Sequence, residues 1–407
     1  MKPKAISLFS GVGGLDFGFE ASGFETRVAL DLDPVACATI RRNRTWPVIE
    51  GDLATIESST ILKAGKLKRG EADVLFGGPP CQPFSKSGYW ATGDAKRLTD
   101  PRAGTLKHFL RVLGETQPKT FLLENVPGLA FSGKNEGLQF IRRGIEHINT
   151  KTGANYSLHI GMLNAADFGV PQTRERVVMV GARDGQAFHF PSPTHAPRGQ
   201  RLLDLPHYRT AWDALGDLPE PTDDPGLAMT GKWADLLATI PEGENYLWHT
   251  ARGGGVPLFG WRTRFWNFML KLAKDQPSWT IQAQCGPATG PFHWRNRKLS
   301  ATELGRLQTL PDGLMFNCAR GDIQRLIGNA VPSLLAEVLA REIKAQLLGA
   351  RRSHASLKLL PPDRGTPPPP TRPAKLPAKY RAIAGVHTEH PGPGKGPGAK
   401  ARSRRAA

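Results

Sequence analysis

Short apolar runs alternate with helical patterns along the first ~185 residues of the chain. This alternation is typical of a parallel α/β sheet with helices on its faces. After the second apolar run, Asp33 is a favourable N-cap and Pro34 suits the first position of a helix. The predicted strands are 5–9, 27–32, 72–76, 119–124, 156–163 and 176–182.

The texture of the chain changes from about residue 191, where the sequence becomes rich in Pro, Gly and Trp and loses its periodicity. Regularity returns near Leu299 and closes with an amphipathic pattern over 331–349, which predicts a helix. The Pro-rich sequence that follows lacks the apolar residues needed to bury a core. We therefore predict a mostly parallel α/β unit (1–190 with 320–349), an inserted smaller and irregular unit (191–319), and a disordered basic tail (350–407).

The positive charge of the chain favours a polyanionic partner. The net charge is +18 over 407 residues, and residues 351–407 hold 13 Lys/Arg against two acids, which leaves +7 on the rest. Phosphate neutralisation supplies most non-specific affinity for nucleic acids, so such a partner is plausible for both parts. A charge that serves solubility alone is an equally good explanation of the number.

The cysteines and the apolar runs also restrict the class of protein. Four cysteines lie far apart without a CxxC pair, which argues against a disulfide framework and against a structural zinc. The N-terminal apolar run is too short for a signal peptide, and no window approaches the ~18 apolar residues of a membrane span. These features predict a soluble cytoplasmic protein without a metal.

The predicted strands end in residues that suit a nucleoside. Gly11 and Gly13 lie in "LFSGVGGLDFG" between the first strand and its helix, where a glycine turn lets a ligand approach the backbone. A tight strand–helix turn without a ligand explains these glycines equally well. Asp31 ends the second strand, and Asp52 follows the third apolar stretch. Together these strand ends predict a nucleoside-type pocket.

A lone cysteine, Cys81, follows the strand 72–76 in the stretch "GGPPCQPFSKSG". Pro79 and Pro80 fix the backbone before it and expose the thiol at the same sheet edge. Packing, metal binding and nucleophilic chemistry are all open to such a cysteine. A nucleophile needs partial exposure and surroundings that favour the thiolate, and Lys86 and later arginines could provide them.

Three further charged residues stand at the ends of apolar runs. Glu124 in "LLENVPG" is costly there unless it is partnered or poised as an acid, although a capping role is the simpler explanation. Arg174 and Arg176 in "QTRERVVMVG" lie two apart on one face of a predicted edge strand. Both ordinary exposed alternation and contact with an anion or a base fit this pattern.

Taken together, the ordered motifs resemble those of the bacterial DNA (cytosine-5-)-methyltransferases, over roughly residues 5–349. Several of the motifs are weak alone, but PPCQPFS with ENV and QTRER in sequence is highly specific. The resemblance implies a Rossmann-like, class I S-adenosylmethionine-dependent methyltransferase fold. The matching stretches are "LFSGVGGLDFG", the acidic end of the second strand, "GD" at 51–52, "GGPPCQPFSKSG", "ENV", "QTRER", "RKLSATELGRLQTLPD" (297–312) and "IGNAVP" (327–332).

The resemblance also implies roles for individual residues. Cys81 would attack carbon 6 of a cytosine flipped out of the duplex, Glu124 would bind the ring N3 and amine, and Arg176 the O2. Arg174 would support the loop and the backbone phosphates as part of the same catalytic group. DNA contacts are expected at Ser85 and Ser87, in a loop (85–105) that closes over the base. The residues expected to bind S-adenosylmethionine are Phe9, Gly11, Gly13, Asp31, Asp52, Pro79 and Asn329.

The insert at 190–297 corresponds to the family's target-recognition segment. Tryptophans and arginines interleave there, and between Tyr246 and Lys298 the only acid is Asp275. Arginines can contact phosphates and read guanine edges, whereas most of the tryptophans are expected to form a small core. The expected DNA contacts are Arg252, Arg262, Arg264 and Arg295, and the tryptophans expected in the core are Trp261, Trp266 and Trp279.

We therefore predict a site-specific DNA cytosine-5 methyltransferase that serves restriction–modification. Its expected partners are double-stranded DNA and a cognate restriction endonuclease, and it is expected to be a nucleoid-associated monomer in the cytoplasm. A tRNA cytosine-5 methyltransferase of related architecture is the alternative enzyme. A sequence-specific DNA-binding protein that has lost catalysis is the alternative from another class.

Overall fold

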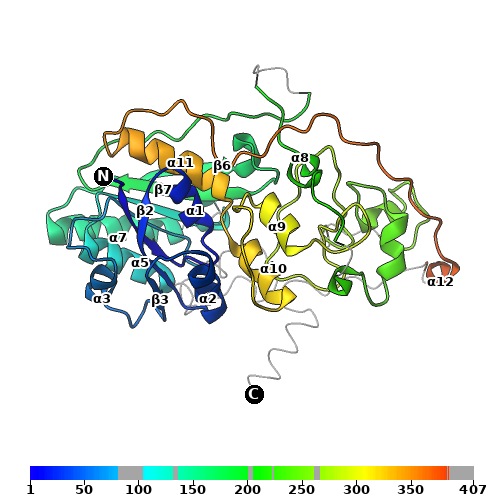
Figure 1. Ribbon diagram of the computed structural model, residues 1–407, viewed down its shortest axis with the longest axis horizontal. Helices are drawn as coiled ribbons and strands as arrows, with labels where there is room; N and C mark the ends of the chain where they lie inside the picture. The colour runs from blue at the N-terminus through cyan, green and yellow to red at the C-terminus, as the bar shows by residue number, and fades with distance from the viewer. Residues whose placement is uncertain are drawn as a thin grey trace.

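The structure is a computed structural model that describes residues 1–80, 104–131, 136–199, 205–221, 224–260, 266–382 and 384. Seven strands form one sheet in the order β3-β2-β1-β4-β5-β7-β6 (Figure 1). Strands β1 to β5 are parallel, and β7 is antiparallel to both of its neighbours, β5 and β6. The prediction of a mostly parallel α/β sheet is therefore confirmed. The strands are β1 (Lys4–Leu8), β2 (Glu25–Asp31), β3 (Val48–Glu50), β4 (Val74–Gly77), β5 (Thr120–Asn125), β6 (His159–Asn164) and β7 (Glu175–Ala182).

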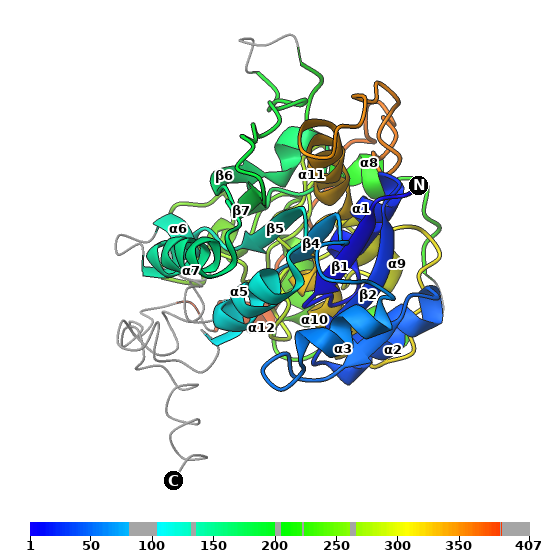
Figure 2. The same cartoon turned by 90° about the vertical axis from the view of Figure 1, so that its left-hand side faces the viewer.

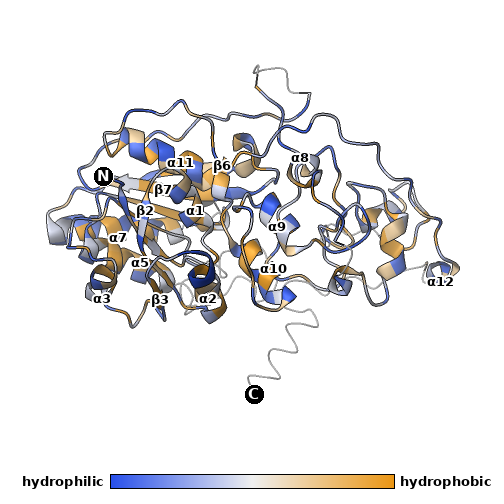
Figure 3. Cartoon of the chain, in the orientation of Figure 1, coloured by the Kyte–Doolittle hydropathy of each residue, from blue (hydrophilic) through white to orange (hydrophobic). Residues whose placement is uncertain are grey.

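Helices cover both faces of the sheet because the central strands β1, β4, β5 and β7 carry buried apolar side chains on both sides (Figure 2). One face is covered by α1 (Gly14–Ala21) and α11 (Ser333–Gln346), and the other by α3 (Ser58–Ala64), α5 (Gly104–Thr116) and α7 (Glu136–Thr152). Hydrophobic colours gather on the strands between these layers (Figure 3). The remaining elements of this half are α2 (Pro34–Asn43), α6 (Gly128–Phe131) and η3 (Ala165–Phe168).

The irregular unit (residues 191–319) is built mostly from short helical turns and loops, as its weak periodicity predicts. Its main buried cluster includes Leu236, Tyr246, Met269 and Phe292. A second cluster joins it to the sheet unit (1–190 with 320–349), because Trp294 and Leu304 share a core with residues of α1 and α2. The elements are α8 (Ala211–Leu215), η4 (Pro225–Leu227), η5 (Ala234–Thr239), η6 (Tyr246–His249) and α9 (Ala301–Leu307), followed by α10 (Arg320–Asn329).

The prediction of a disordered tail from residue 350 is wrong for residues 350–382, which we call the strap. The strap leaves the end of α11, passes α8 and ends in α12 (Ala378–Arg381) on the irregular unit (Figure 1). Leu357, Leu359 and Leu360 pack against the core beneath α11, and Tyr380 is buried in the core of the irregular unit. Composition suggested disorder because the strap's few apolar residues form two short groups separated by Pro-rich sequence, yet both groups pack against cores built by other parts of the chain.

None of the helices that the structure describes combines the length and the apolar character needed to cross a membrane.

Candidate active site

The loop between β1 and α1 presents open backbone at the carboxyl edge of the sheet. Gly11 and Gly13 have positive φ values of 54° and 91°, and Phe9, at 53°, shares this unusual region. A Cβ built on Gly11 would meet no atom within 4 Å, so there is space in front of this turn. A Cβ on Gly14 would instead lie 2.4 Å from the Val331 carbonyl oxygen, which brings "IGNAVP" against the loop.

Asp31, at the end of β2, fixes this loop. Its Oδ2 accepts a 2.7 Å hydrogen bond from the Gly11 N–H, and its Oδ1 accepts a 2.9 Å bond from the Asp33 N–H. Burial raises the pKa of the Asp31 carboxyl above its usual value, although these two N–H donors oppose the shift. Asp52 is close to Asp31, because the N–H of the preceding Gly51 donates to the Asp31 carbonyl oxygen over 2.9 Å. The Asp52 side chain is exposed. The predicted cluster of Gly11, Asp31 and Asp52 is therefore brought together at one edge.

A buried polar network that the sequence analysis missed lies beneath the same loop. Asp16, in the first turn of α1, is fully buried and accepts hydrogen bonds from Ser7 Oγ (3.0 Å) and Thr26 Oγ1 (3.4 Å). Ser7 Oγ lies 2.8 Å from Ser10 Oγ, which also accepts a bond from the Leu30 N–H. Burial raises the pKa of Asp16 to about 7 despite the bond from Ser7. The available signal was an acid between Leu15 and Phe17 in a short helix whose residues from Gly14 to Phe19 are all buried.

Glu124 and Arg176 form a nearly buried ion pair at the end of β5. In the antiparallel β5–β7 ladder Glu124 lies opposite Val178, which makes Arg176 its diagonal neighbour on the same face. Arg176 Nε is 2.8 Å from Glu124 Oε1, and their side chains are 13% and 11% exposed. Burial lowers the pKa of the Arg176 guanidinium while Glu124 opposes the shift, and arginine stays charged. The acid that seemed costly in the sequence is thus partnered.

The turn after β4 lies directly against this ion pair. A Cβ on Gly78 would be 2.8 Å from Glu124 Oε2, so only glycine fits without displacing the carboxylate. The carbonyl oxygen of Pro79 accepts a 3.1 Å hydrogen bond from Asn125 Nδ2, which ties the turn to the end of β5. Asn125 and Gly78 were not among the predicted site residues. Cys81 itself lies outside the described residues, but the described chain before it ends at Pro80, two residues after the Gly78 that lies against Glu124.

Arg174 is a buried tie between distant segments. Its side chain donates to the carbonyl oxygens of Ile281 (3.3 Å) and Gly328 (2.9 Å), and the residue is only 2% exposed. Burial lowers the pKa of this guanidinium well below its usual value, with the like charge of Arg176 as the second cause. The described position faces protein rather than solvent, so it does not match the expected contact with backbone phosphates. Arg174 instead holds Gly328, the residue before Asn329, close to the start of β7.

The other predicted residues are distributed as follows. Pro79 is at the active-site turn, and Asn329 is an exposed residue at the end of α10. Arg252 and Arg295 are both exposed, and Arg295 also forms a 2.6 Å ion pair with Glu220. The expected DNA contacts Ser85, Ser87, Arg262 and Arg264, and the loop that includes the two serines, lie outside the described residues.

Two tryptophans predicted to be core residues are exposed, so that prediction is wrong for them. Trp266 and Trp279 are 45% and 40% exposed and pack edge-to-face with ring centroids 5.5 Å apart. Trp279 follows Ser278, whose backbone pairs with Pro171 and Thr173 over 2.8 Å each, next to Arg174. Trp294 is buried, and Trp261 lies outside the described residues. Composition could not separate these roles because tryptophan serves both cores and binding surfaces.

Comparisons with known proteins agree with this architecture. The type II methyltransferase M.SacI of Streptomyces achromogenes is 40% identical over 369 residues, which cover 84% of this chain and 93% of that protein. M.NgoFVII of Neisseria gonorrhoeae, also a type II methyltransferase, is 35% identical over 346 residues, covering 84% and 86%.

Solved structures show the same fold at lower identity. A prophage-encoded protein of E. coli superposes with a TM-score of 0.58 at 22% identity, covering 86% of this chain and all of that one. The Dnmt2 methyltransferase of S. pombe gives a TM-score of 0.55 at 16% identity, with coverages of 85% and 99%. The model of the C-5 cytosine-specific DNA methylases matches residues 3–345. The chain therefore belongs to the C-5 cytosine-specific DNA methylase family and is a DNA cytosine-5 methyltransferase.

Proposed function

We propose that Cys81 is the nucleophile of a site-specific enzyme that methylates a cytosine flipped out of duplex DNA. The observation that carries this proposal is the Glu124–Arg176 ion pair, which lies against Gly78 only three residues before Cys81. A carboxylate and a guanidinium at that place offer complementary groups to the polar edge of a cytosine. The turn Pro79–Pro80 fixes where the thiol is delivered.

The roles of the protein groups follow from their chemistry. The Cys81 thiolate adds to carbon 6 of the base, and the electrons of the 5,6 double bond become available at carbon 5. Glu124 accepts a hydrogen bond from the exocyclic amine and, in its protonated form, donates its proton to N3, while Arg176 donates to O2; the proton at N3 and the guanidinium together stabilise the negative charge that the ring gains. After carbon 5 is methylated, loss of its proton and departure of the Cys81 thiolate restore the double bond. Arg174 serves as a positioning residue because its described contacts are with protein backbone.

The residues at the first two strand ends fit S-adenosylmethionine. Open space over Gly11 admits a ligand to the backbone, and the Asp31 and Asp52 carboxylates suit hydroxyl and ammonium groups. Phe9, Gly13, Pro79 and Asn329 complete the proposed site. When bound, this cofactor supplies an electrophilic methyl group for carbon 5. The Ser7–Asp16–Ser10 network holds the loop that would receive it.

We propose that the enzyme acts in restriction–modification, as a monomer whose target site is shared with a cognate endonuclease. The names of the relatives support this role, since they are type II methyltransferases over most of their length. Bisulfite sequencing of random-sequence duplex DNA after incubation with the enzyme would give the recognition site.

We further propose that Trp266 and Trp279 contact the DNA. Trp279 follows Ser278, which pairs with residues 171 and 173 just before the strand that carries Arg176, and the exposed Trp266 ring packs on Trp279. The charged residues around them in the sequence are mostly basic, and Arg252 is exposed in the same unit. Aromatic rings stack on bases or sugars without sequence preference. This arrangement suits a duplex from which one base has been flipped out.

Trapping with 5-fluorocytosine tests the proposal directly. A fluorine at carbon 5 cannot leave as a proton does, so duplex DNA with this base and S-adenosylmethionine should give a covalent protein–DNA adduct. Cys81→Ser should give none. Cys285→Ser and Cys318→Ser, at an exposed and a half-buried cysteine, are matched controls that should still form the adduct. An adduct that persists in Cys81→Ser would exclude the proposed nucleophile.

A further inference from the structure

Buried carboxylates from both units accept the backbone N–H groups of the strap. The first is Glu337 of α11, whose two oxygens accept 2.9 Å hydrogen bonds from the N–H groups of Lys358 and Leu359. The Glu337 side chain is 0% exposed and also pairs with Arg341 over 2.7 Å. Charged acceptors make stronger hydrogen bonds than neutral ones, so this contact fixes the strap on the sheet unit.

The second carboxylate belongs to the irregular unit. Asp213 of α8 accepts a 2.8 Å bond from the Arg364 N–H, and its carbonyl oxygen accepts a 3.0 Å bond from Arg364 Nε. The Arg364 guanidinium also pairs with Asp217 over 2.8 Å. The preceding residue, Asp363, forms an ion pair with Arg209 over 2.8 Å. Two consecutive residues of the strap, Asp363 and Arg364, are therefore bound to the irregular unit.

The third carboxylate is Glu242, further into the irregular unit. Its Oε1 accepts from the Thr371 N–H (3.0 Å) and from Lys274 Nζ (2.6 Å), and the two side chains of the ion pair are 4% and 8% exposed. Lys274 also donates to the Pro369 carbonyl oxygen over 3.3 Å. The strap thus donates a hydrogen bond to Glu242 and accepts one from Lys274, so it contacts both members of this buried ion pair.

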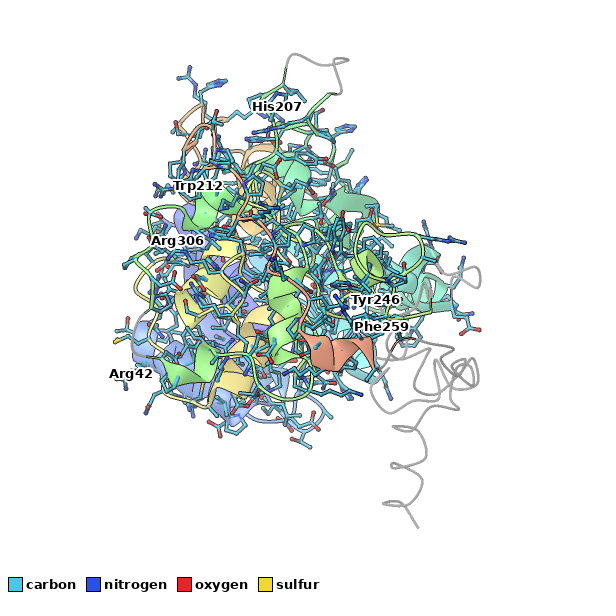
Figure 4. The ribbon with its side chains drawn as sticks, turned by 90° about the vertical axis from the view of Figure 1, so that its right-hand side faces the viewer. Arg42, His207, Trp212, Tyr246, Phe259 and Arg306 are labelled. Atoms are coloured by element: carbon cyan, nitrogen blue, oxygen red, sulfur yellow. The ribbon has the colours of Figure 1, made fainter. Side chains whose placement is uncertain are left out.

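The strap ends on an aromatic anchor. The Tyr380 ring stacks on Trp233 at 6.2 Å and 13°, and its hydroxyl donates to the Lys232 carbonyl oxygen over 2.9 Å. Figure 4 shows α12 close to the labelled Tyr246 and Phe259, which belong to the same aromatic core. Residues 361–377 contain eight prolines, and such segments are stiff and extended. A stiff segment that is bonded to the sheet unit at one end and to the irregular unit at the other restricts how the two units can move relative to each other.

We propose that the strap is a positioning element that holds the irregular unit in register with the active site. It lies outside the residues 3–345 that match the family model. The inference rests on the proposed role of the irregular unit in target recognition. If the strap fixes the distance between the recognised bases and the flipped cytosine, then loosening it costs the cognate site more than a site that is already badly aligned.

Full-length variants that change only strap contacts test this role. Thr371→Pro removes the N–H that Glu242 accepts, whereas Thr371→Val keeps it. Tyr380→Ala removes the anchor, whereas Tyr380→Phe keeps the stacked ring. The recognition site is first determined with the wild type, and kcat/KM is then measured on cognate DNA and on DNA with one altered base pair.

We expect Tyr380→Ala to raise the KM for DNA and to lower the cognate-to-altered ratio by about 10-fold or more, since a ~1 Å misplacement can cost about 100-fold in rate. Thr371→Pro should change the ratio in the same direction, and should decide the question alone if Tyr380→Ala does not fold. The Val and Phe variants should resemble the wild type, and the KM for S-adenosylmethionine should stay constant in all of them.

Two outcomes would overturn the proposal. One is an unchanged ratio in both Thr371→Pro and Tyr380→Ala. The other is an equal fall in rate on both DNAs, because that result is expected if the strap only stabilises the fold. A wild type that methylates without any site preference would instead contradict the proposed recognition role, which keeps the two failures distinguishable.

Discussion

The buried carboxyl of Asp16 should make the stability of the protein depend on pH. Asp16 lies under the loop between β1 and α1, with no exposed surface and with a pKa of about 7 compared with the ordinary 3.8. Between these two values the folded protein binds a proton that the unfolded chain has released. The free energy of unfolding therefore falls as the pH rises through this window, and above pH 7 the loss is complete.

The size of the effect follows from the two pKa values. Each pH unit between them corresponds to about 1.4 kcal/mol, so the whole window amounts to about 4 kcal/mol and the part above pH 5 to about 3 kcal/mol. Asp16→Asn keeps the shape of the side chain but stays neutral at every pH. The free energy of unfolding of the variant, relative to that of the wild type, should therefore rise by about 3 kcal/mol between pH 5 and pH 8.

Urea unfolding followed by circular dichroism at a series of pH values measures this difference. Asp184→Asn, the same substitution on an exposed side chain, is the matched control for the loss of one carboxylate. If the stabilities of Asp16→Asn and the wild type stay parallel from pH 5 to pH 8, within the ~0.5 kcal/mol of a neutral surface change, the buried-acid argument is refuted.

Three further predictions concern the active site and its surroundings. Gly78→Ala places a Cβ 2.8 Å from Glu124 Oε2 and should lower the single-turnover rate by about 100-fold with an unchanged circular dichroism spectrum; a wild-type rate would mean that Glu124 need not stay in place. Arg174→Met leaves the Ile281 and Gly328 carbonyl oxygens unpaired and should cost about 2–3 kcal/mol in urea unfolding, so a loss below ~0.5 kcal/mol would contradict the tie. Trp279→Ala should weaken DNA binding in a fluorescence titration by about 1–3 kcal/mol while S-adenosylmethionine binding stays constant, and unchanged DNA affinity would remove Trp279 from the interface.

The sheet and the grouping of Gly11, Asp31 and Pro79 at one of its edges could be predicted because both follow from local patterns. Apolar runs located the strands, and parallel strands place Gly11, Asp31 and Pro79 at one edge whatever the details of packing. The partner of Glu124 could not be obtained in this way. It depends on β7 entering antiparallel to β5 in a register that puts Arg176 diagonally opposite, and this register is a property of the assembled sheet.

The strap shows the opposite limit. Its composition predicts disorder because composition counts only the residues of the segment itself. Its order comes from Glu337, Asp213 and Glu242, which are far away in the sequence and are buried with their charges directed at the strap backbone. A buried Glu in a helix such as α11 is the sequence signal that could have indicated a missing partner.

The most direct test of the central claim is the identity of the methylated atom and its dependence on Cys81. Duplex DNA is incubated with isotopically methyl-labelled S-adenosylmethionine, digested to nucleosides and analysed by mass spectrometry. The wild type should place the label on carbon 5 of cytosine, Cys285→Ser should do the same, and Cys81→Ser should transfer none. Label on an exocyclic nitrogen, or carbon-5 methylation by Cys81→Ser, would contradict the account.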